Sequence, residues 1–177
     1  MKVKFTYEDY RHMPDDKRYE LIEGELVMVP SPITMHQRIS RKLEFILAEF
    51  VQKNNLGEVF YAPFDVVFSD EDVLQPDIIF ISNGRSSIVT QDNVQGAPDL
   101  VVEITSPTTL YRDREIKRKV YAKYGVGEYW LVDTDKQTIE VMVLGEKGFK
   151  TVAVCRRGEM LQSPLLIGFS FDTSEIF

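Results

Sequence analysis

The chain has 177 residues, of which 44% are hydrophobic and 28% are charged, an ordinary composition for a globular protein. This composition excludes a long disordered chain, and the length predicts one domain over 1–177 whose core needs no disulfides. The formal net charge of −7, from 28 acidic and 21 basic residues, argues against a protein that coats nucleic acid nonspecifically. A single cysteine and the lack of an apolar signal or membrane segment lead us to expect a cytoplasmic protein.

The N-terminal part is predicted to contain two helices and a hairpin. A short helix is expected over 6–13, with a threonine as its N-cap. The segment YELIEGELVMV predicts two strands joined by a tight Glu-Gly turn. From Thr34 the apolar residues recur at three- and four-residue spacing, which predicts a helix to about Lys53. Thr34 and Gln37 match a capping box at its start.

The rest of the chain is predicted to alternate strands with one further helix. Strands are expected over 58–68, 76–82 and 98–104, and a helix follows over 113–124. GEYWLVD predicts another strand, and TIEVMVL and FKTVAVC predict a C-terminal hairpin. Because each helix has one apolar stripe to bury, the order predicts an α/β fold of mixed α+β type, with helices on the faces of a mixed central sheet.

Three acidic residues lie in otherwise apolar strands. Asp77 begins one strand, and Asp99 and Glu103 lie in APDLVVEITS, where alternate side chains share a face with Thr105. A buried carboxylate is costly unless it is paired, hydrogen-bonded or bound to a metal, so Glu103 is the strongest functional candidate. Asp77 and Asp99 each follow a proline, where an acid often only bonds the local backbone.

The second predicted helix carries a possible partner for these acids. Asp113, Lys117 and Tyr121 follow one another at four-residue steps and so share one stripe. Two interpretations remain open for Lys117: a solvated pair with Asp113, or an ammonium group turned toward the carboxylates.

The same helix is the most basic segment of the chain. Arg112, Arg118 and Lys119 are candidates for contacts to a phosphate backbone. A charge run of this kind also occurs as a simple solvated face, and the sequence leaves both readings open.

Several of these strings together resemble a known family. QPDIIFI, GAPDLVVEITSPTT and DREIKRKVYAKYGVGEYWLVD, with RYELIEGELVMVPSPITMHQRI upstream, resemble the Uma family of putative restriction endonucleases, a branch of the PD-(D/E)xK nuclease-like superfamily. The resemblance covers 18–154 and implies a restriction-endonuclease-like core, in agreement with the element order above. It implies a Mg²⁺-dependent endonuclease that hydrolyses DNA phosphodiester bonds with a metal-activated water.

The resemblance also implies the roles of particular residues. Asp77, Glu103 and the backbone carbonyl of Ile104 would bind Mg²⁺, with Mn²⁺ as an alternative. The lysine that the superfamily places two residues after the glutamate is Thr105 here. Lys117 is the expected substitute, which would position or activate the attacking water and neutralise developing charge.

Further residues are candidates for the same cleft, and some alternatives stay open. These candidates are Glu20, Glu23, His36, Asp99, Thr105, Asp113 and Tyr121. A structural role remains open for His36. The missing strand lysine also permits a different class, a nuclease-fold protein that binds nucleic acid or a protein without cutting. We expect DNA as the partner, with RNA as the open alternative. We also expect a homodimer, for which the C-terminal hairpin offers a strand edge.

Overall fold

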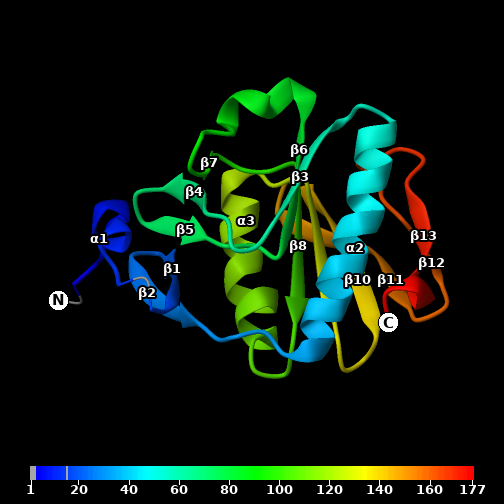
Figure 1. The fold of residues 1–177 in the computed structure, drawn as a ribbon, viewed down its shortest axis with the longest axis horizontal. Coiled ribbons are helices and arrows are strands. Elements are labelled where there is room, and N and C mark those ends of the chain that lie inside the picture. Colours follow the sequence, from blue (N-terminus) through cyan, green and yellow to red (C-terminus); the bar gives the residue numbers. More distant parts are fainter. Residues whose placement is uncertain (1–2, 15) are drawn as a thin grey trace.

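The computed structural model describes residues 3–14 and 16–177 of the chain (Figure 1). Its centre is a six-stranded sheet in the order β11-β10-β9-β8-β6-β3. The strands are β3 (Gly57–Tyr61), β6 (Ile78–Ser82), β8 (Leu100–Thr105), β9 (Glu128–Asp133), β10 (Thr138–Gly145) and β11 (Gly148–Arg156). Strands β8 and β9 are parallel, and every other neighbouring pair is antiparallel. The predicted mixed central sheet and C-terminal hairpin are therefore confirmed.

A second, five-stranded sheet has the order β2-β1-β5-β4-β7. Its strands are β1 (Arg18–Ile22), β2 (Glu25–Val29), β4 (Val66–Ser69), β5 (Asp72–Leu74) and β7 (Val94–Gln95). The predicted N-terminal hairpin is confirmed, and Gly24 adopts a φ of 78° in its turn, a conformation that glycine reaches without strain. Helix α1 (Tyr7–Arg11) begins at the predicted N-cap Thr6, which forms a capping box with Asp9.

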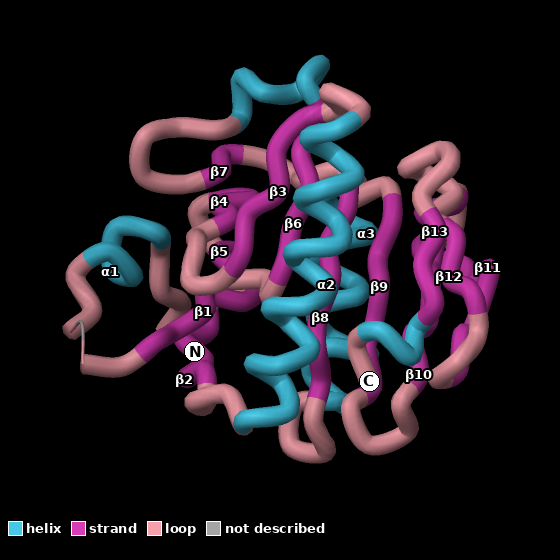
Figure 2. The backbone as a smooth tube through the Cα atoms, turned by 45° about the vertical axis from the view of Figure 1, so that its right-hand side comes forward, coloured by secondary structure: helices cyan, strands magenta, loops and turns pink. Residues whose placement is uncertain are grey.

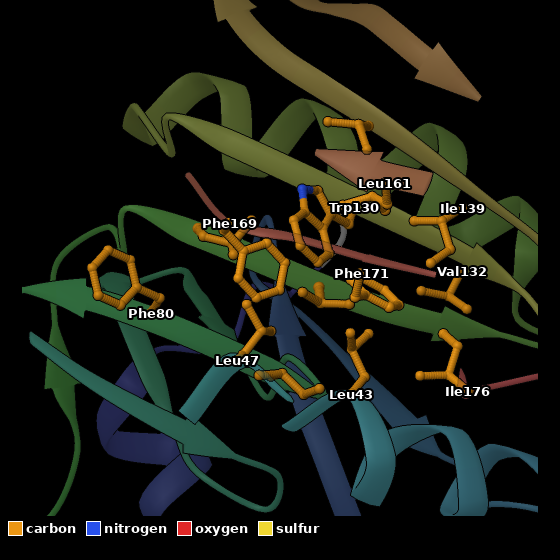
Figure 3. Close-up of a cluster of buried hydrophobic side chains, with 14 of the residues drawn as sticks. Leu43, Leu47, Phe80, Trp130, Val132, Ile139, Leu161, Phe169, Phe171 and Ile176 are labelled. Atoms are coloured by element: carbon orange, nitrogen blue, oxygen red, sulfur yellow. The ribbon is translucent and has the colours of Figure 1, made fainter. Parts of the chain in front are cut away.

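One face of the central sheet is covered by α2 (Thr34–Lys53) and by the C-terminal segment, which contains β12 (Met160–Gln162), β13 (Ser170–Asp172) and the 3₁₀-helix η3 (Thr173–Glu175). Figure 2 shows α2 lying in front of β8 and β6 and running along them. Leu43 and Leu47 of α2 pack into a buried cluster with Trp130 and Phe169 (Figure 3). This burial of a whole helix stripe fixes α2 on the sheet.

The opposite face packs against the third helix and the second sheet. This helix consists of a π-helical turn, η2 (Arg112–Lys117), followed by α3 (Arg118–Tyr124), and it ends at Gly125 as predicted. A further 3₁₀-helix, η1 (Asn83–Ile88), follows β6. Val101 of β8 packs on this face, whereas Leu100 and Val102 pack under α2. The predicted alternation of β8 is thus confirmed, and it places Glu103 on the face toward α3.

Two local predictions are wrong. The segment 58–68 forms two strands, β3 and β4, in different sheets, because Pro63 between them has no N–H for a ladder. Thr34 does not cap α2: it is the first helical residue, the N-cap is Ile33, and no side chain bonds the cap. A side-chain cap comes from the extended residue directly before the helix, and the isoleucine at this position has no side-chain acceptor.

Within the described residues, no helix is long and apolar enough to cross a membrane.

Candidate active site

Lys117 lies at the centre of a buried group of acids, here called the Lys117 cluster (Lys117, Glu20, Glu103, Asp113 and Tyr121). Its Nζ lies 2.8 Å from Oε1 of Glu20, 3.0 Å from Oε1 of Glu103 and 3.8 Å from Oδ1 of Asp113. The Tyr121 hydroxyl donates a short hydrogen bond to the same Glu103 oxygen. The structure thus supports the second interpretation of Lys117, an ammonium group turned toward the carboxylates, over a solvated surface pair.

Four different elements bring these side chains together. Glu20 comes from β1 of the second sheet, and Glu103 comes from β8 of the central sheet. Asp113 and Lys117 lie on the π-helical turn, and Tyr121 follows on α3, so the predicted stripe is confirmed. A π-helical turn interrupts regular helix geometry and is found frequently at functional sites.

Burial and charge together set the protonation of the cluster. Burial raises the pKa of Glu103 well above its ordinary value, and the neighbouring acids add to this while Lys117 opposes it. Burial likewise raises the pKa of Asp113, against the opposing effect of Lys117. Burial alone would lower the pKa of Lys117, but Glu103, Glu20 and Asp113 together raise it. Lys117 therefore remains a cation that can donate hydrogen bonds, which suits charge stabilisation and not proton abstraction.

Asp77 lies beside the cluster and is held from two sides. Its Oδ2 accepts the backbone N–H of Ile104 at 2.7 Å, and its Oδ1 lies 3.1 Å from Nε2 of His36. His36 projects from the first turn of α2. In Figure 1 the start of α2 and the carboxyl end of β8 lie at the same lower end of the molecule. The orientation of Asp77 is therefore fixed by one backbone donor and one imidazole.

A pocket of about 490 Å³, here called the central pocket, opens onto these groups. Its floor contains Glu20, Asp77, Glu103, Asp113 and Lys117, and its wall contains His36, Ile104 and Arg112. Of the predicted site residues, the structure therefore gathers these eight. Tyr121 does not line the pocket, but its hydroxyl group donates a hydrogen bond to Glu103, which does.

The remaining predicted residues lie elsewhere. Asp99 accepts the backbone N–H of Ser82 and pairs with Arg85, away from the pocket, as its proline-preceded position allowed. Glu23 lies exposed in the β1–β2 turn. Thr105 is buried and bonds Thr109.

Two of the predicted phosphate contacts also lie outside the pocket. The Arg118 guanidinium donates to the Phe149 carbonyl at 2.6 Å, which occupies it structurally. Lys119 is exposed on α3 and does not line the pocket. Of the three predicted phosphate contacts, Arg112 alone lines the pocket, because a helix turns its successive residues in different directions.

Several residues of the pocket wall are not among those predicted from the sequence. Arg18, Arg41, Tyr61 and Gln75 line the central pocket, and Arg18 donates to Gln75 at 3.0 Å. The sequence contained a pattern that could have identified Gln75, because this residue directly precedes Pro76 and Asp77 in the string QPD. Arg18, Arg41 and Tyr61 reach the pocket through tertiary packing, and no short sequence pattern points to them.

A divalent cation fits this site in donor chemistry and charge. Three carboxylates lie within 4 Å of the Lys117 ammonium group and Asp77 lines the same pocket, and carboxylate oxygens are the ligands that Mg²⁺ and Ca²⁺ prefer. Oε2 of Glu20 is buried and has no hydrogen-bond partner among the described residues, so one acceptor is left for an incoming donor or cation. Across 3–14 and 16–177, however, no three acidic, histidine or cysteine side chains are already spaced around one ion. The donors would have to draw together on binding.

Fold and site together define a protein of the restriction-endonuclease-like type. The family model described as "Uma2: Putative restriction endonuclease" matches residues 7–174, and the chain belongs to this family. A solved structure from Anabaena variabilis ATCC 29413, described as "a putative nuclease belonging to DUF820", has the same fold with a TM-score of 0.81. It is 20% identical, and the match covers 98% of this chain and 97% of that chain. No curated protein matches the chain.

Proposed function

We propose that the protein is a divalent-metal-dependent endonuclease that hydrolyses phosphodiester bonds of DNA. The observation that carries this proposal is the buried lysine that contacts acids from two different sheets, beside Asp77 and at the floor of an open pocket. Family membership supports a nuclease. A purely structural ion pair would not need an adjoining pocket with a fourth acid at its floor.

Asp77, Glu103 and the Ile104 carbonyl are the proposed ligands of the cation. When bound, a divalent cation stabilises charge on the phosphoryl oxygens and lowers the pKa of a coordinated water. His36 and the Ile104 N–H keep Asp77 oriented toward the pocket. Tyr121 does the same for Glu103 through its hydroxyl.

Lys117 replaces the lysine that the superfamily carries at position 105. Its ammonium protons hold Glu20 and Glu103 in place and face the pocket where a phosphodiester would enter. As a cation, it stabilises the negative charge that develops on the phosphate during water attack. Arg112 at the pocket wall is the proposed contact to the phosphate backbone.

The test is cleavage of plasmid DNA with and without Mg²⁺ or Mn²⁺ by purified variants. Glu103→Gln and Lys117→Met are expected to lower cleavage at least about 100-fold, the effect of removing a group that stabilises the transition state. Glu128→Gln changes a buried glutamate on the neighbouring strand outside the pocket, and Lys147→Met changes an exposed lysine. Both controls are expected to cleave at the wild-type rate per folded molecule.

Calorimetry distinguishes the alternative class. The wild type is expected to bind Mn²⁺, and Asp77→Asn to bind it more weakly. If the wild type binds neither Mg²⁺ nor Mn²⁺ and cuts no DNA, the proposal is wrong. The protein is then a nuclease-fold protein that binds nucleic acid or a protein without cutting, as Thr105 in place of lysine permits.

A further inference from the structure

The reacting groups lie deep below the protein surface. The side chains of Lys117 and Glu103 are 6% and 4% exposed, and that of Asp77 is 15% exposed. A duplex carries its phosphates on the outside of a wide and stiff rod. A phosphodiester in a strand that is unpaired or strongly bent can therefore reach this floor more readily than one in a straight duplex, as in enzymes that extrude their target nucleotide.

A second pocket, of about 840 Å³, adjoins the central pocket. The two pockets share Arg18, Pro63 and Gln75 as lining residues. The second pocket extends from this shared wall to helix α1 and to the loop around Asn93. The two pockets adjoin at these shared residues and are here together called the groove.

The groove combines aromatic and basic side chains. Tyr7, Tyr10 and Tyr19 line the second pocket, and Tyr61 lines the central pocket with 62% of its surface exposed. Proteins that bind single-stranded nucleic acid use such a combination: bases stack on aromatic rings, and cationic side chains follow the backbone.

The basic residues of the second pocket are Arg11, Lys17 and Arg18, and its acids are Asp65 and Asp92. Oδ1 of Asp65 accepts hydrogen bonds of 2.8 Å from both the Tyr10 hydroxyl and the Gln75 amide. Asp92 is exposed. Among the described residues the three cations outnumber the two acids. Asp65 is engaged by the protein, and so are Arg18, which donates to Gln75, and Arg11, whose Nη1 lies 3.8 Å from Oε2 of Glu8, so Lys17 is the cation that has no such contact within the described part of the chain.

The tyrosine rings are held in position by their hydroxyl groups. Asn93 donates to the Tyr7 hydroxyl at 2.8 Å, and Tyr10 is fixed by Asp65. The two rings lie 6.2 Å apart and are inclined by 25°. Fixed rings lose little conformational freedom on stacking, which favours binding.

We propose that the groove binds an unpaired nucleic-acid strand. The central pocket takes the nucleotide at the cleaved bond, and the second pocket takes the nucleotides next to it. Their bases stack on Tyr7 and Tyr19, and Arg11 and Lys17 contact their phosphates. The assignment of the cleaved bond to the central pocket rests on the proposed function, whereas strand binding by the second pocket can be tested alone.

The test is fluorescence anisotropy in EDTA, which prevents metal-dependent cleavage, with a labelled oligothymidylate and a blunt duplex of equal length. The wild type is expected to bind the single strand at least about tenfold more tightly. Tyr7→Ala and Tyr19→Ala are each expected to weaken single-strand binding about fivefold or more, the lower end of what one stacked base contributes. Tyr111→Ala is the matched control, because Tyr111 is 73% exposed and lines neither pocket.

A charge variant keeps the test valid if a tyrosine variant fails to fold. Lys17 is exposed, so Lys17→Glu leaves the core intact and is expected to weaken single-strand binding, whereas Lys147→Glu is not. Equal affinity for strand and duplex, or binding unchanged in all groove variants, would overturn the proposal. If binding depends on the groove residues but no DNA is cleaved, only the proposed hydrolysis is contradicted. If closed duplex is cleaved, and the groove variants cleave it as fast as the wild type, only the proposed strand binding by the groove is contradicted.

Discussion

Lys117 and Glu20 come from different halves of the chain, and their charged groups lie 2.8 Å apart in the interior. This contact joins the π-helical turn to the N-terminal hairpin, and through Glu103 it joins both to the central sheet. The backbone N–H of Gln75 donates to the same Glu20 oxygen at 2.9 Å. The N-terminal hairpin is therefore part of the site and not an appendage to it.

Lys117→Met is expected to destabilise the protein as well as to abolish cleavage. It leaves buried carboxylates without their cation, at a cost of about 3 kcal/mol at pH 8. The cost is expected to shrink toward pH 5, because Glu103 and Asp113, whose pKa values are already raised, take up protons instead. Urea unfolding of the variant and the wild type at both pH values measures it, with Lys147→Met as the exposed control. A cost that is the same at both pH values would contradict this account.

The pH dependence of stability is expected to carry the signature of Glu103. Its pKa is raised in the folded protein, so between the ordinary value of about 4.3 and the raised value the native chain binds more protons than the unfolded one. The stabilisation that this proton contributes is fully present when the pH is below the pKa of Glu103 in the unfolded chain. It is lost as the pH rises through the pKa of Glu103 in the folded protein. The stability of the wild type minus that of Glu103→Gln should therefore fall from pH 4 to pH 8 in EDTA.

Unfolding in urea, followed by circular dichroism across this pH range, measures the difference. Asp113 titrates in both proteins, so its contribution cancels to first order. Excess Mg²⁺ is expected to flatten the slope, because a bound cation favours the ionised carboxylate. A difference that does not change with pH would show that Glu103 ionises as an ordinary glutamate does.

The sequence predicts the central sheet and the stripe of η2 and α3 because both depend on local periodicity. Val101 and Glu103 share a face of β8 by alternation, and Asp113, Lys117 and Tyr121 share a stripe by their four-residue spacing. The second sheet depends on contacts between distant short strands. Strands β5 and β7 have three and two residues, too few for any periodicity, so neither was predicted.

In the candidate site, too, residues placed by local patterns were predicted, and residues placed by tertiary packing were not. Spacing and resemblance pointed to Asp77, Glu103 and Lys117, which the structure brings to one pocket. The wall residues Arg41 and Tyr61 enter through packing of α2 and β3, which no short-range pattern encodes. Arg118 and Lys119 share a charge run with Arg112, but charge alone does not tell which helix face meets the pocket.

Glu128 tests whether a buried acid outside the pocket is purely structural. Its carboxylate accepts hydrogen bonds from the Trp130 indole at 2.6 Å, the Ser163 hydroxyl at 2.9 Å and the Leu165 amide at 2.7 Å. These bonds attach the C-terminal segment to β9. Glu128→Ala leaves the buried Trp130 N–H and Ser163 O–H and the partly buried Leu165 N–H without their acceptor, and is expected to cost about 3 kcal/mol. Thermal unfolding measures the loss, and proteolysis should become faster after 156.

Cleavage by Glu128→Ala is expected to stay at the wild-type rate per folded molecule. This result would separate it from Glu103→Gln, which changes a glutamate of similar burial. A loss of cleavage in a folded Glu128→Ala protein would show that the C-terminal segment acts on the site.

The edge strand β11 is the expected contact of a homodimer. It is nine residues long, it lies at the end of the central sheet, and Val152 and Val154 are about half exposed on it. A long strand edge with apolar side chains is a template for pairing with a second copy of the same strand. Light scattering after size exclusion is expected to give a dimer, and Val154→Lys a monomer, because it places a charge at the paired edge. The exposed apolar residue Phe45 of α2 supplies the control, since Phe45→Lys should remain dimeric. A monomeric wild type, or a dimeric Val154→Lys protein, would rule out this edge as the interface.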